Sequence, residues 1–588
     1  MTARARGVRS PPPRGPARWL ALRRLGVLSL VVLLLVGAVQ VGRWYLRTRS
    51  LQWQVRRAFA LLDQADSRGT VHEALAQWER ETRPAWEPRR DEFIAHLFTR
   101  ADLADARVRL LLSRVAGADY GDRRADWERW YQTRQRLRAG QPPTVSRSER
   151  IKLEPRWSAP IGLTGWFTTI LPMDGAIYVA SLGADFDDAQ DPSDGIVRVD
   201  GMSGTSELIF TPPSPIGRGP RDVIGIAAGT NCMYAGCANG FVYCVEPGGQ
   251  LRWETHVASA VEGPPLSIDF NDDGTDDVVV ITRNAEVVAL SGKTGRTVWV
   301  AKVGDPPAGA SLLGATLTLG DVLAGQGDEI VATTPRGDVA VIAARNGRLR
   351  WQTRLDAGSL AGAVCRASQR VQGPPVYVGD SGAWLWSLVH AGQSLEAVYW
   401  GTLTWDPADT QIAGLRTLRS EPEGQPILIA CSTGEYERGR AAVSALSAVG
   451  AHWRLPIDGA VWGTPAIADL NGDRQLELVV AAITPGANGD LRGAFNIVSH
   501  AGHLLKRHEL EAPIECSPVV ADVDGDNLLE ILVADQAGRL HCFATTGYGP
   551  VVWGLHAGDS HNTRNADHAY SWGQAPFGYQ RQWRPAPE

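Results

Sequence analysis

Residues 269–299 read DFNDDGTDDVVVITRNAEVVALSGKTGRTVW and contain every part of a pattern that recurs along the chain. Two apolar runs, VVVI and VVAL, are separated by a polar turn, which predicts a β-hairpin. A second turn, with Gly295, then leads to Trp299, so we expect a third strand there. The clustered carboxylates at the start are poor strand formers and mark a loop before the first strand.

The hairpin recurs in four other places, each time as a strand, a turn containing Gly or Asn, and a second strand. These copies are YAGCANGFVYCV from Tyr234, VATTPRGDVAVIA from Val331, YVGDSGAWLWSL from Tyr377 and LVADQAGRLHCF from Leu532. A turn followed by Trp appears again at Trp253, Trp351 and Trp453. The copies are about fifty residues apart, and a period of this size with strand content predicts a β-propeller or a similar array.

Residues 152–565 form the predicted propeller, an all-β domain with room for about eight blades. The segment WSAPIG at Trp157 has the character of the last strand of a blade, although it lies at the N-terminal end. We expect this strand to complete the final blade and close the ring, because closure removes exposed sheet edges. One Trp per blade, packed between neighbouring blades, would explain most of the 21 tryptophans.

The N-terminal region has a different composition. Residues 1–24 are rich in Arg and Pro and contain no acid, which predicts a disordered cytoplasmic tail. Residues 25–42, LGVLSLVVLLLVGAVQVG, are just long enough to span a bilayer. We expect a single-pass transmembrane helix that anchors the chain in the cell membrane, with the excess of Arg before it facing the cytoplasm. A cleaved signal peptide is the alternative, although no small-x-small site ends the run.

Residues 43–140 carry apolar positions at helical spacing, and we expect an α-helical stalk or small helical domain there. A linker over 141–151 and a tail over 566–588 complete the predicted organisation. The net charge is −5 even with seven arginines before the predicted span, so the remaining chain is acidic, which argues against a nucleic-acid partner. The seven cysteines lack zinc-site spacing, and we interpret most of them as small buried hydrophobic residues.

The acidic loop occurs three times with the same spacing. Asp or Asn stands at positions one, three and five and an acid at position nine, as in Asp269, Asn271, Asp273 and Asp277; Asp469, Asn471, Asp473 and Glu477; and Asp522, Asp524, Asp526 and Glu530. Alternate oxygens of this kind suit Ca²⁺, which takes six to eight oxygen ligands. The first loop begins like an EF-hand, but Val280 stands where position twelve needs Glu. Polar turns without a metal are the alternative.

With these loops ahead of hydrophobic strands, the chain resembles bacterial proteins of the FG-GAP/VCBS class, whose propellers resemble the integrin α-subunit head. It also resembles quinoprotein-like propellers with a PQQ-type, Trp-docking repeat. In FG-GAP propellers a backbone carbonyl at position seven completes the calcium site, which implies Thr275, Gln475 and Leu528 as further metal ligands. The resemblance implies structural calcium, and weak calcium sites fill only near millimolar Ca²⁺, which implies an extracytoplasmic propeller.

Two features depart from the regular pattern. Position six is Gly274 in the first loop but Arg474 and Asn527 in the others, and Arg adopts a left-handed conformation less readily than Asn. A fourth copy, GDVLAGQGDEIV, keeps Asp321 and Glu329 but has Leu323 at position three and Gly at position five. We expect this fourth loop to have lost its metal.

No catalytic set emerges from the sequence. Ser381 lies in a GDSG stretch like that of chymotrypsin-like proteases, but the stretch occupies a hairpin turn of the repeat and lacks a companion His motif. The stretch WGLHAGDSHNTRN resembles the closing Trp-Asp motif of such repeats. Ser560, His561 and His568 are close together there, and we interpret them as part of an exposed polar terminal loop rather than a triad.

We therefore predict a membrane-anchored, extracytoplasmic propeller with structural calcium that binds a protein or glycan, as an adhesion or interaction module, and is not an enzyme. One alternative is an envelope-assembly scaffold of the propeller type. The other is a quinone-dependent or carbohydrate-active enzyme, although no two cysteines are adjacent, as they are in quinone dehydrogenases. Enzyme function would lose support if side chains plugged the propeller channel.

Overall fold

The computed structural model describes residues 51–64, isolated positions between 75 and 111, and most of 151–565. In the last range the residues outside the description are 185–190, 214–219, 306–310, 324–326, 356–359, 366–375, 381–383, 392–393, 403–408, 420–425, 435–439, 448–449, 474, 487 and 550. The predicted tail 1–24, the predicted transmembrane helix 25–42 and the tail 566–588 also lie outside the described residues. The chain divides into two compact units, Met1–Trp127 and Glu128–Glu588.

The N-terminal unit contains one described helix, α2 (Leu51–Gln64). Its buried side chains, Leu51, Val55, Ala58 and Leu62, recur at helical spacing and form one face. The rest of the helical segment predicted over 43–140 lies largely outside the described residues. No helix in the described part of the chain is both long enough and apolar enough to cross a membrane.

The second unit is built from antiparallel sheets, seven of four strands and one of five. In chain order, the first four sheets are β2 (Ile170–Met173), β3 (Ala176–Leu182), β4 (Asp194–Asp200) and β5 (Ser206–Phe210); β6 (Val223–Gly229), β7 (Cys232–Cys237), β8 (Phe241–Val245) and β9 (Leu251–His256); β10 (Leu266–Ile268), β11 (Asp277–Ile281), β12 (Glu286–Leu290) and β13 (Thr297–Lys302); and β14 (Thr316–Gly320), β15 (Glu329–Thr333), β16 (Asp338–Ala343) and β17 (Leu349–Arg354). The other four are β18 (Leu360–Cys365), β19 (Val376–Asp380), β20 (Trp384–Ala391) and β21 (Ser394–Thr402); β22 (Asp409–Arg419), β23 (Pro426–Gly434), β24 (Arg440–Ser447) and β25 (Gly450–Asp458); β26 (Ala466–Ala468), β27 (Glu477–Pro485), β28 (Leu491–Ser499), β29 (Leu504–Leu510) and β33 (Val551–Trp553); and β1 (Glu154–Pro160), β30 (Val519–Ala521), β31 (Glu530–Asp535) and β32 (Arg539–Ala544).

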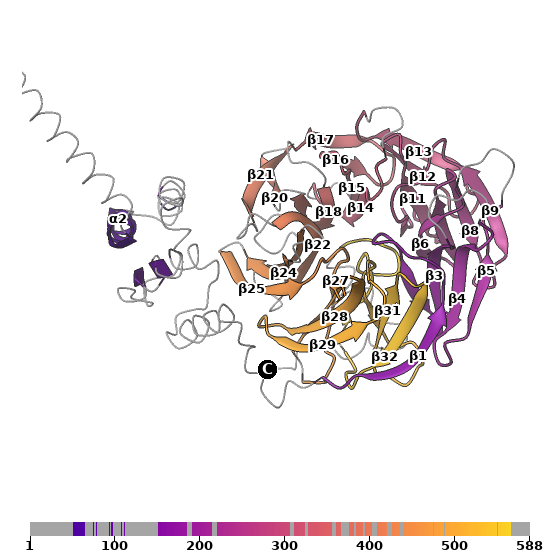
Figure 1. Cartoon of the computed structure of the whole chain (residues 1–588). Coiled ribbons are helices and arrows are strands. Elements are labelled where there is room, and N and C mark those ends of the chain that lie inside the picture. The colour runs from indigo at the N-terminus through magenta and orange to yellow at the C-terminus, as the bar shows by residue number, and fades with distance from the viewer. Residues whose placement is uncertain are drawn as a thin grey trace, which may run out of the picture. The chain divides into compact units, whose positions relative to one another are not determined.

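The sheets are arranged around a common axis in the manner of a β-propeller (Figure 1). The middle strands are buried on both faces, so β7, β8, β11 and β16 read as nearly continuous apolar runs. Each buried Val, Leu or Ile contributes roughly 1.5–3 kcal/mol of transfer free energy. The outer strands, such as β9 and β13, alternate between buried and exposed side chains instead.

The ring closes as the sequence predicts. Strand β1 pairs antiparallel with β32, so Trp157 lies opposite Cys542 at the outer edge of the last sheet. One core cluster joins Val179 of the first sheet to Leu532 of the last. The N-terminal strand thus completes a sheet whose other strands come from the C-terminal end, and this confirms the prediction made from WSAPIG.

Four tryptophans on outer strands form hydrogen bonds to the backbone of the next sheet. The indole Nε1 of Trp253 donates to the carbonyl of Gly292 at 2.8 Å, and that of Trp299 to the carbonyl of Ala344 at 2.9 Å. Trp157 and Trp453 make the same bond to the following sheets. A Cβ on Gly295, which has φ +69°, would lie 2.7 Å from the Trp253 ring, so this turn requires glycine. The predicted packing of tryptophans between sheets is confirmed for these four.

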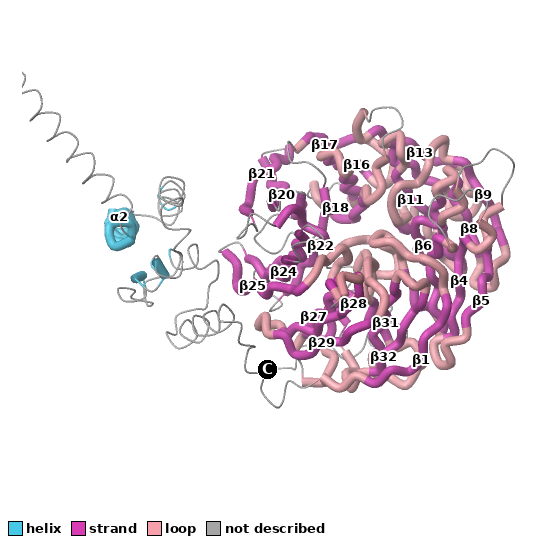
Figure 2. Tube along the Cα trace, viewed as in Figure 1, coloured by secondary structure: helices cyan, strands magenta, loops and turns pink. Residues whose placement is uncertain are grey.

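The segment 554–565, which follows β33 and which we call the axial segment, lines the inner strands around the axis of the ring. Backbone carbonyls of Ser560, His561 and Thr563 accept hydrogen bonds from the inner strands β6, β10 and β14. The Nδ2 of Asn562 donates to the carbonyls of Ile226 and Pro265, at 2.9 and 2.8 Å. Figure 2 shows loop segments running inside the ring of strands.

The prediction of an exposed polar loop at this end of the chain is wrong for the last residues of the axial segment. Asn562, Thr563, Arg564 and Asn565 are at most 6% exposed. Their polar groups are satisfied by inner strands that are hundreds of residues away in the sequence, which local composition does not reveal. Ser560 and His561 do lie in contact, with Oγ 3.2 Å from Nδ1, and His568 lies outside the described residues.

Candidate metal centres

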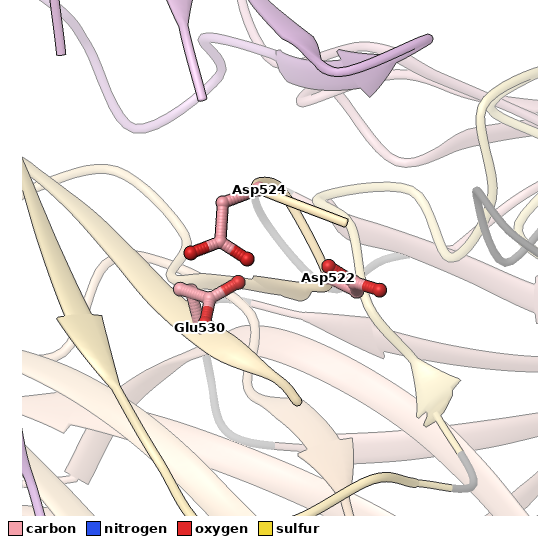
Figure 3. A group of neighbouring side chains, drawn as sticks. All are labelled: Asp522, Asp524 and Glu530. Atoms are coloured by element: carbon pink, nitrogen blue, oxygen red, sulfur yellow. The ribbon is translucent and has the colours of Figure 1, made fainter. Parts of the chain in front are cut away.

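The loop 522–530, between β30 and β31, brings three carboxylates together. One oxygen from each of Asp522, Asp524 and Glu530 lies within 4.8 Å of the others, and Figure 3 shows the three carboxylates facing one another. Two oxygens bound to one Ca²⁺ at about 2.4 Å each can be at most about 5 Å apart. The group therefore has the size of a calcium site, and no second such group occurs among the described residues.

Glu530 is the most informative residue of this loop. Its Oε2 accepts the amide of Val523 at 3.0 Å, but its Oε1 is buried and has no hydrogen-bond partner. Burial raises the pKa of this carboxyl to about 8, with smaller contributions from the charges of Asp524, Asp526 and Asp522. A buried carboxylate oxygen without a donor carries a desolvation cost of several kcal/mol, which a bound cation would offset.

In the other two loops, an asparagine amide at position three lies next to the clustered carboxylates. In the first loop the amide Nδ2 of Asn271 donates to Asp277 Oδ2 at 2.9 Å. In the second, Asn471 Nδ2 lies 3.2 Å from Asp473 Oδ2 and 3.4 Å from Glu477 Oε1. An amide N–H thus stands where a cation would otherwise neutralise the carboxylates. Asp524 has no N–H to donate, so the third loop lacks this internal substitute.

The three loops nevertheless share one backbone frame. The amide of position seven donates to the position-five carboxylate in each, at 3.0 Å from Thr275, 2.8 Å from Gln475 and 2.7 Å from Leu528. Gly274 has φ +78° and Asn527 φ +66°, so position six adopts the left-handed conformation that the sequence predicts. Arg474 lies outside the described residues.

Basic side chains form ion pairs with the position-five aspartate in two of the loops. Lys293 Nζ lies 3.2 Å from Asp273 Oδ2, and an Arg156 nitrogen lies 3.5 Å from Asp526 Oδ2. All four side chains are about a third exposed or more, so solvent screens both pairs and each contributes little to stability. These contacts reduce the repulsion at the rim without reaching the buried acids at position nine. Burial raises the pKa of Asp277 to about 6 despite them.

The fourth copy keeps the backbone frame and the acids at positions one and nine but has no acid at positions three and five. Glu329 Oε2 accepts the amides of Val322 and Leu323 at 2.9 and 3.1 Å, as Glu530 does with Val523. Burial raises the pKa of Glu329 too. Leu323 stands where the other loops carry an oxygen ligand, and position five lies outside the described residues. The buried acid at position nine therefore also serves to hold the loop against the next strand.

Among the described residues the structure groups three of the predicted ligands, Asp522, Asp524 and Glu530, and Asp526 is not part of that group. The three loops lie in three different sheets. The sequence did not reveal Arg416 of β22, which is fully buried near the axial segment. A charged residue inside the strand DTQIAGLRTLR was the available signal.

Known proteins give a limited comparison. Residues 215–417 match the family model described as outer membrane protein assembly factor BamB. No curated protein matches the chain. Among solved structures, Sqt1 of Saccharomyces cerevisiae has a TM-score of 0.47 at 8% identity, covering 67% of this chain and 99% of that one. BamB of Moraxella catarrhalis scores 0.31 at 16% identity, covering 54% and 92%. A europium-containing methanol dehydrogenase scores 0.44 at 13%, covering 69% and 95%.

Proposed function

We propose that the protein is a non-enzymatic binding scaffold, a closed propeller of eight blades that is braced by calcium and engages a protein partner. The observation that carries the proposal is the axial segment. It hydrogen-bonds to the inner strands β6, β10 and β14, and Gly554 accepts from Val520 of β30. A substrate or cofactor pocket typically has a volume of about 300–1,000 Å³, and here the backbone of the chain itself lies against the inner strands along the axis. Binding on an outer surface is therefore better supported than catalysis in the channel.

The outer strands offer a surface for such a partner. Exposed apolar side chains recur on the last strands of four consecutive sheets, β5, β9, β13 and β17: Leu208 at 41%, Leu251 at 41%, Val298 at 47%, Val300 at 51% and Leu349 at 42% exposure. Each of these strands is also a sheet edge with unpaired backbone groups. Apolar groups beside an open edge favour a partner that adds main-chain hydrogen bonds.

The kind of partner is suggested by the matched family. Its model covers β9, β13 and β17 and is described by an envelope-assembly factor, which favours an assembly scaffold over an adhesion module. We place the propeller on the extracytoplasmic side of the cell membrane, held by residues 25–42, because this location supplies the calcium that weak loops need. Calcium belongs first in the loop 522–530, because Asp522, Asp524 and Glu530 converge there, and then in loops 469–477 and 269–277.

A pair of measurements tests the binding proposal. A photoreactive amino acid at Val300 should yield a discrete crosslinked adduct in native membranes, whereas the same probe at Met202, a 74% exposed turn residue, should not. In parallel, the full chain is titrated with pyrroloquinoline quinone in calcium buffer, and we expect neither saturable binding nor dye reduction with alcohols. Saturable quinone binding with dye reduction, and no adduct from Val300, would identify an enzyme instead.

A further inference from the structure

Two buried arginines, one in the axial segment and one next to it, have no carboxylate ion-pair partner among the described residues. Arg416 of β22 is 0% exposed and Arg564 of the axial segment is 6% exposed. Neither makes an ion pair with an acid among the described residues. A buried charge that is not paired is costly, because removing it from water loses several kcal/mol of solvation. The protein keeps two such charges near each other, and they repel.

Both guanidinium groups form hydrogen bonds to the same residue, His556. Arg416 donates to the His556 carbonyl, to the Thr464 hydroxyl and, at 2.9 Å, to the carbonyl of Leu415. Arg564 reaches the other end of His556, with a terminal nitrogen 3.1 Å from ring Nε2. The ring Nδ1 lies 2.8 Å from the hydroxyl of Ser517, so Nδ1 carries the proton and Nε2 accepts. This network fixes the two cations side by side.

Hydrogen-bond donors remain unused in this pair. Arg416 Nε is buried and has no partner, although its guanidinium lies 4.8 Å from the Trp553 ring centroid. The guanidinium of Arg564 has five N–H donors, and within the described part of the chain its one side-chain hydrogen bond goes to His556. Asp559 is the acid whose charge reaches Arg416, but its oxygens accept from His561 and Thr563 within its own turn.

Arg564 is also strained. Its backbone has φ +50°, in the left-handed region that an ordinary L residue adopts at a cost of about 1 kcal/mol or more. A glycine would satisfy this backbone without cost, and a neutral side chain would avoid the burial of a second charge. The chain carries an Arg there, so a favourable interaction with its guanidinium must compensate for both costs.

We propose that Arg564, with Arg416 behind it, binds a small oxyanion at the propeller axis, either a phosphate or the carboxylate of a small organic acid. The planar fork of a guanidinium matches both groups in geometry, and a negative charge bound at Arg564 offsets the repulsion between the two cations. His556 acts as the positioning residue, since it holds Arg564 by its ring and Arg416 by its carbonyl.

The test is thermal melting of the full chain in EDTA, so that phosphate does not act by removing calcium. Inorganic phosphate and succinate are titrated separately at constant ionic strength, with chloride as the reference salt. We expect a saturable rise in Tm with at least one of the two anions, and the responsive anion identifies the ligand class. No saturable rise with either anion overturns the proposal.

Variants locate the effect. Arg564→Gly should abolish the anion-dependent rise and leave the anion-free Tm unchanged or higher, because it removes both the strain and the charge. Arg539→Gln, which changes an exposed arginine of β32, is the matched control and should keep the rise. If Arg564→Gly does not fold, Arg564→Lys serves, with at least a tenfold weaker anion response expected. An equal response in the Arg564 variant and the wild type would also overturn the proposal, since binding would then lie elsewhere.

Discussion

The loops 522–530 and 321–329 have the same place in their sheets but different chemistry. In both, a buried glutamate at position nine accepts a backbone amide from the residue after position one, Val523 or Val322. In the first, Asp524 and Asp526 add two more carboxylates, whereas the second carries Leu323 at position three. The comparison separates two roles within one motif. The glutamate fixes the loop to the strand, and the aspartates create the negative charge that a cation would neutralise.

The largest expected effect is that of calcium on the whole propeller. Millimolar Ca²⁺ should raise the Tm of the full chain relative to EGTA, because a ligand at one hundred times its Kd stabilises by about 2.7 kcal/mol per site. The double variant Asp524→Ala/Asp526→Ala should lose a large share of this rise while keeping the Glu530 bond to Val523. The control is Asp490→Ala, an exposed acid in another turn. Equal melting in calcium and EGTA would reduce the loops to polar turns.

A second effect is the pH dependence of the calcium-free protein. Burial raises the pKa of Glu530 from an ordinary 4.5 to about 8. The folded chain then holds this proton more tightly than the unfolded chain, so the free energy of unfolding falls as pH rises from about 4.5 to about 8, by up to about 5 kcal/mol. Urea titrations in EGTA across this range measure it. With saturating calcium the fall should largely disappear, and a fall of the same size with calcium would contradict the site.

A smaller effect is the difference in stability between the Glu530→Gln and Glu329→Gln variants. Glu530→Gln keeps an oxygen for Val523 and removes the buried charge, so we expect it to stabilise the EGTA form by roughly 1–2 kcal/mol and to weaken the calcium response. Glu329→Gln keeps the bonds to Val322 and Leu323 in the same way, but its effect should be the same in calcium and in EGTA. Denaturation midpoints in both buffers show this. A calcium-dependent effect at Glu329 would restore the fourth loop as a site.

The smallest effect concerns the amide at position three. Asn271→Asp replaces the N–H donor to Asp277 with a fourth carboxylate, which makes the first loop resemble loop 522–530. We expect about tenfold tighter calcium binding, near 1.4 kcal/mol, and a lower Tm in EGTA from the added repulsion. Calorimetric titration measures the affinity. Unchanged affinity would mean that position three does not contact the ion.

Much of the fold follows from local patterns in the sequence. The hairpins of β11 and β12, the docking of Trp253 and Trp299, and the closing strand β1 are predictable because each depends on a short pattern repeated at a fixed interval. The axial segment is not predictable in this way. Asn562 reads as a loop residue, and its partners Ile226 and Pro265 lie about three hundred residues earlier in the chain.

The candidate site divides in the same manner. Spacing predicts the same ligand positions in all three loops, since a cation loop is local. Spacing does not reveal that the Glu530 oxygen is buried without a donor, nor that Asn271 and Asn471 turn their amides toward neighbouring acids. Those properties depend on the packing of strands against the loop. The pairing of Arg416 with His556 likewise joins residues 140 positions apart.

The closing strand has a consequence for biosynthesis. Strand β1 is made early but pairs with residues 539–544, and the axial segment follows later still. At 5–20 residues per second, the ribosome needs roughly 20–80 s between these two points. During that interval the edge of β1 and the inner strands are without their partners, and such edges are prone to aggregation. Efficient production therefore requires that the nascent chain be protected until residues 539–565 have emerged.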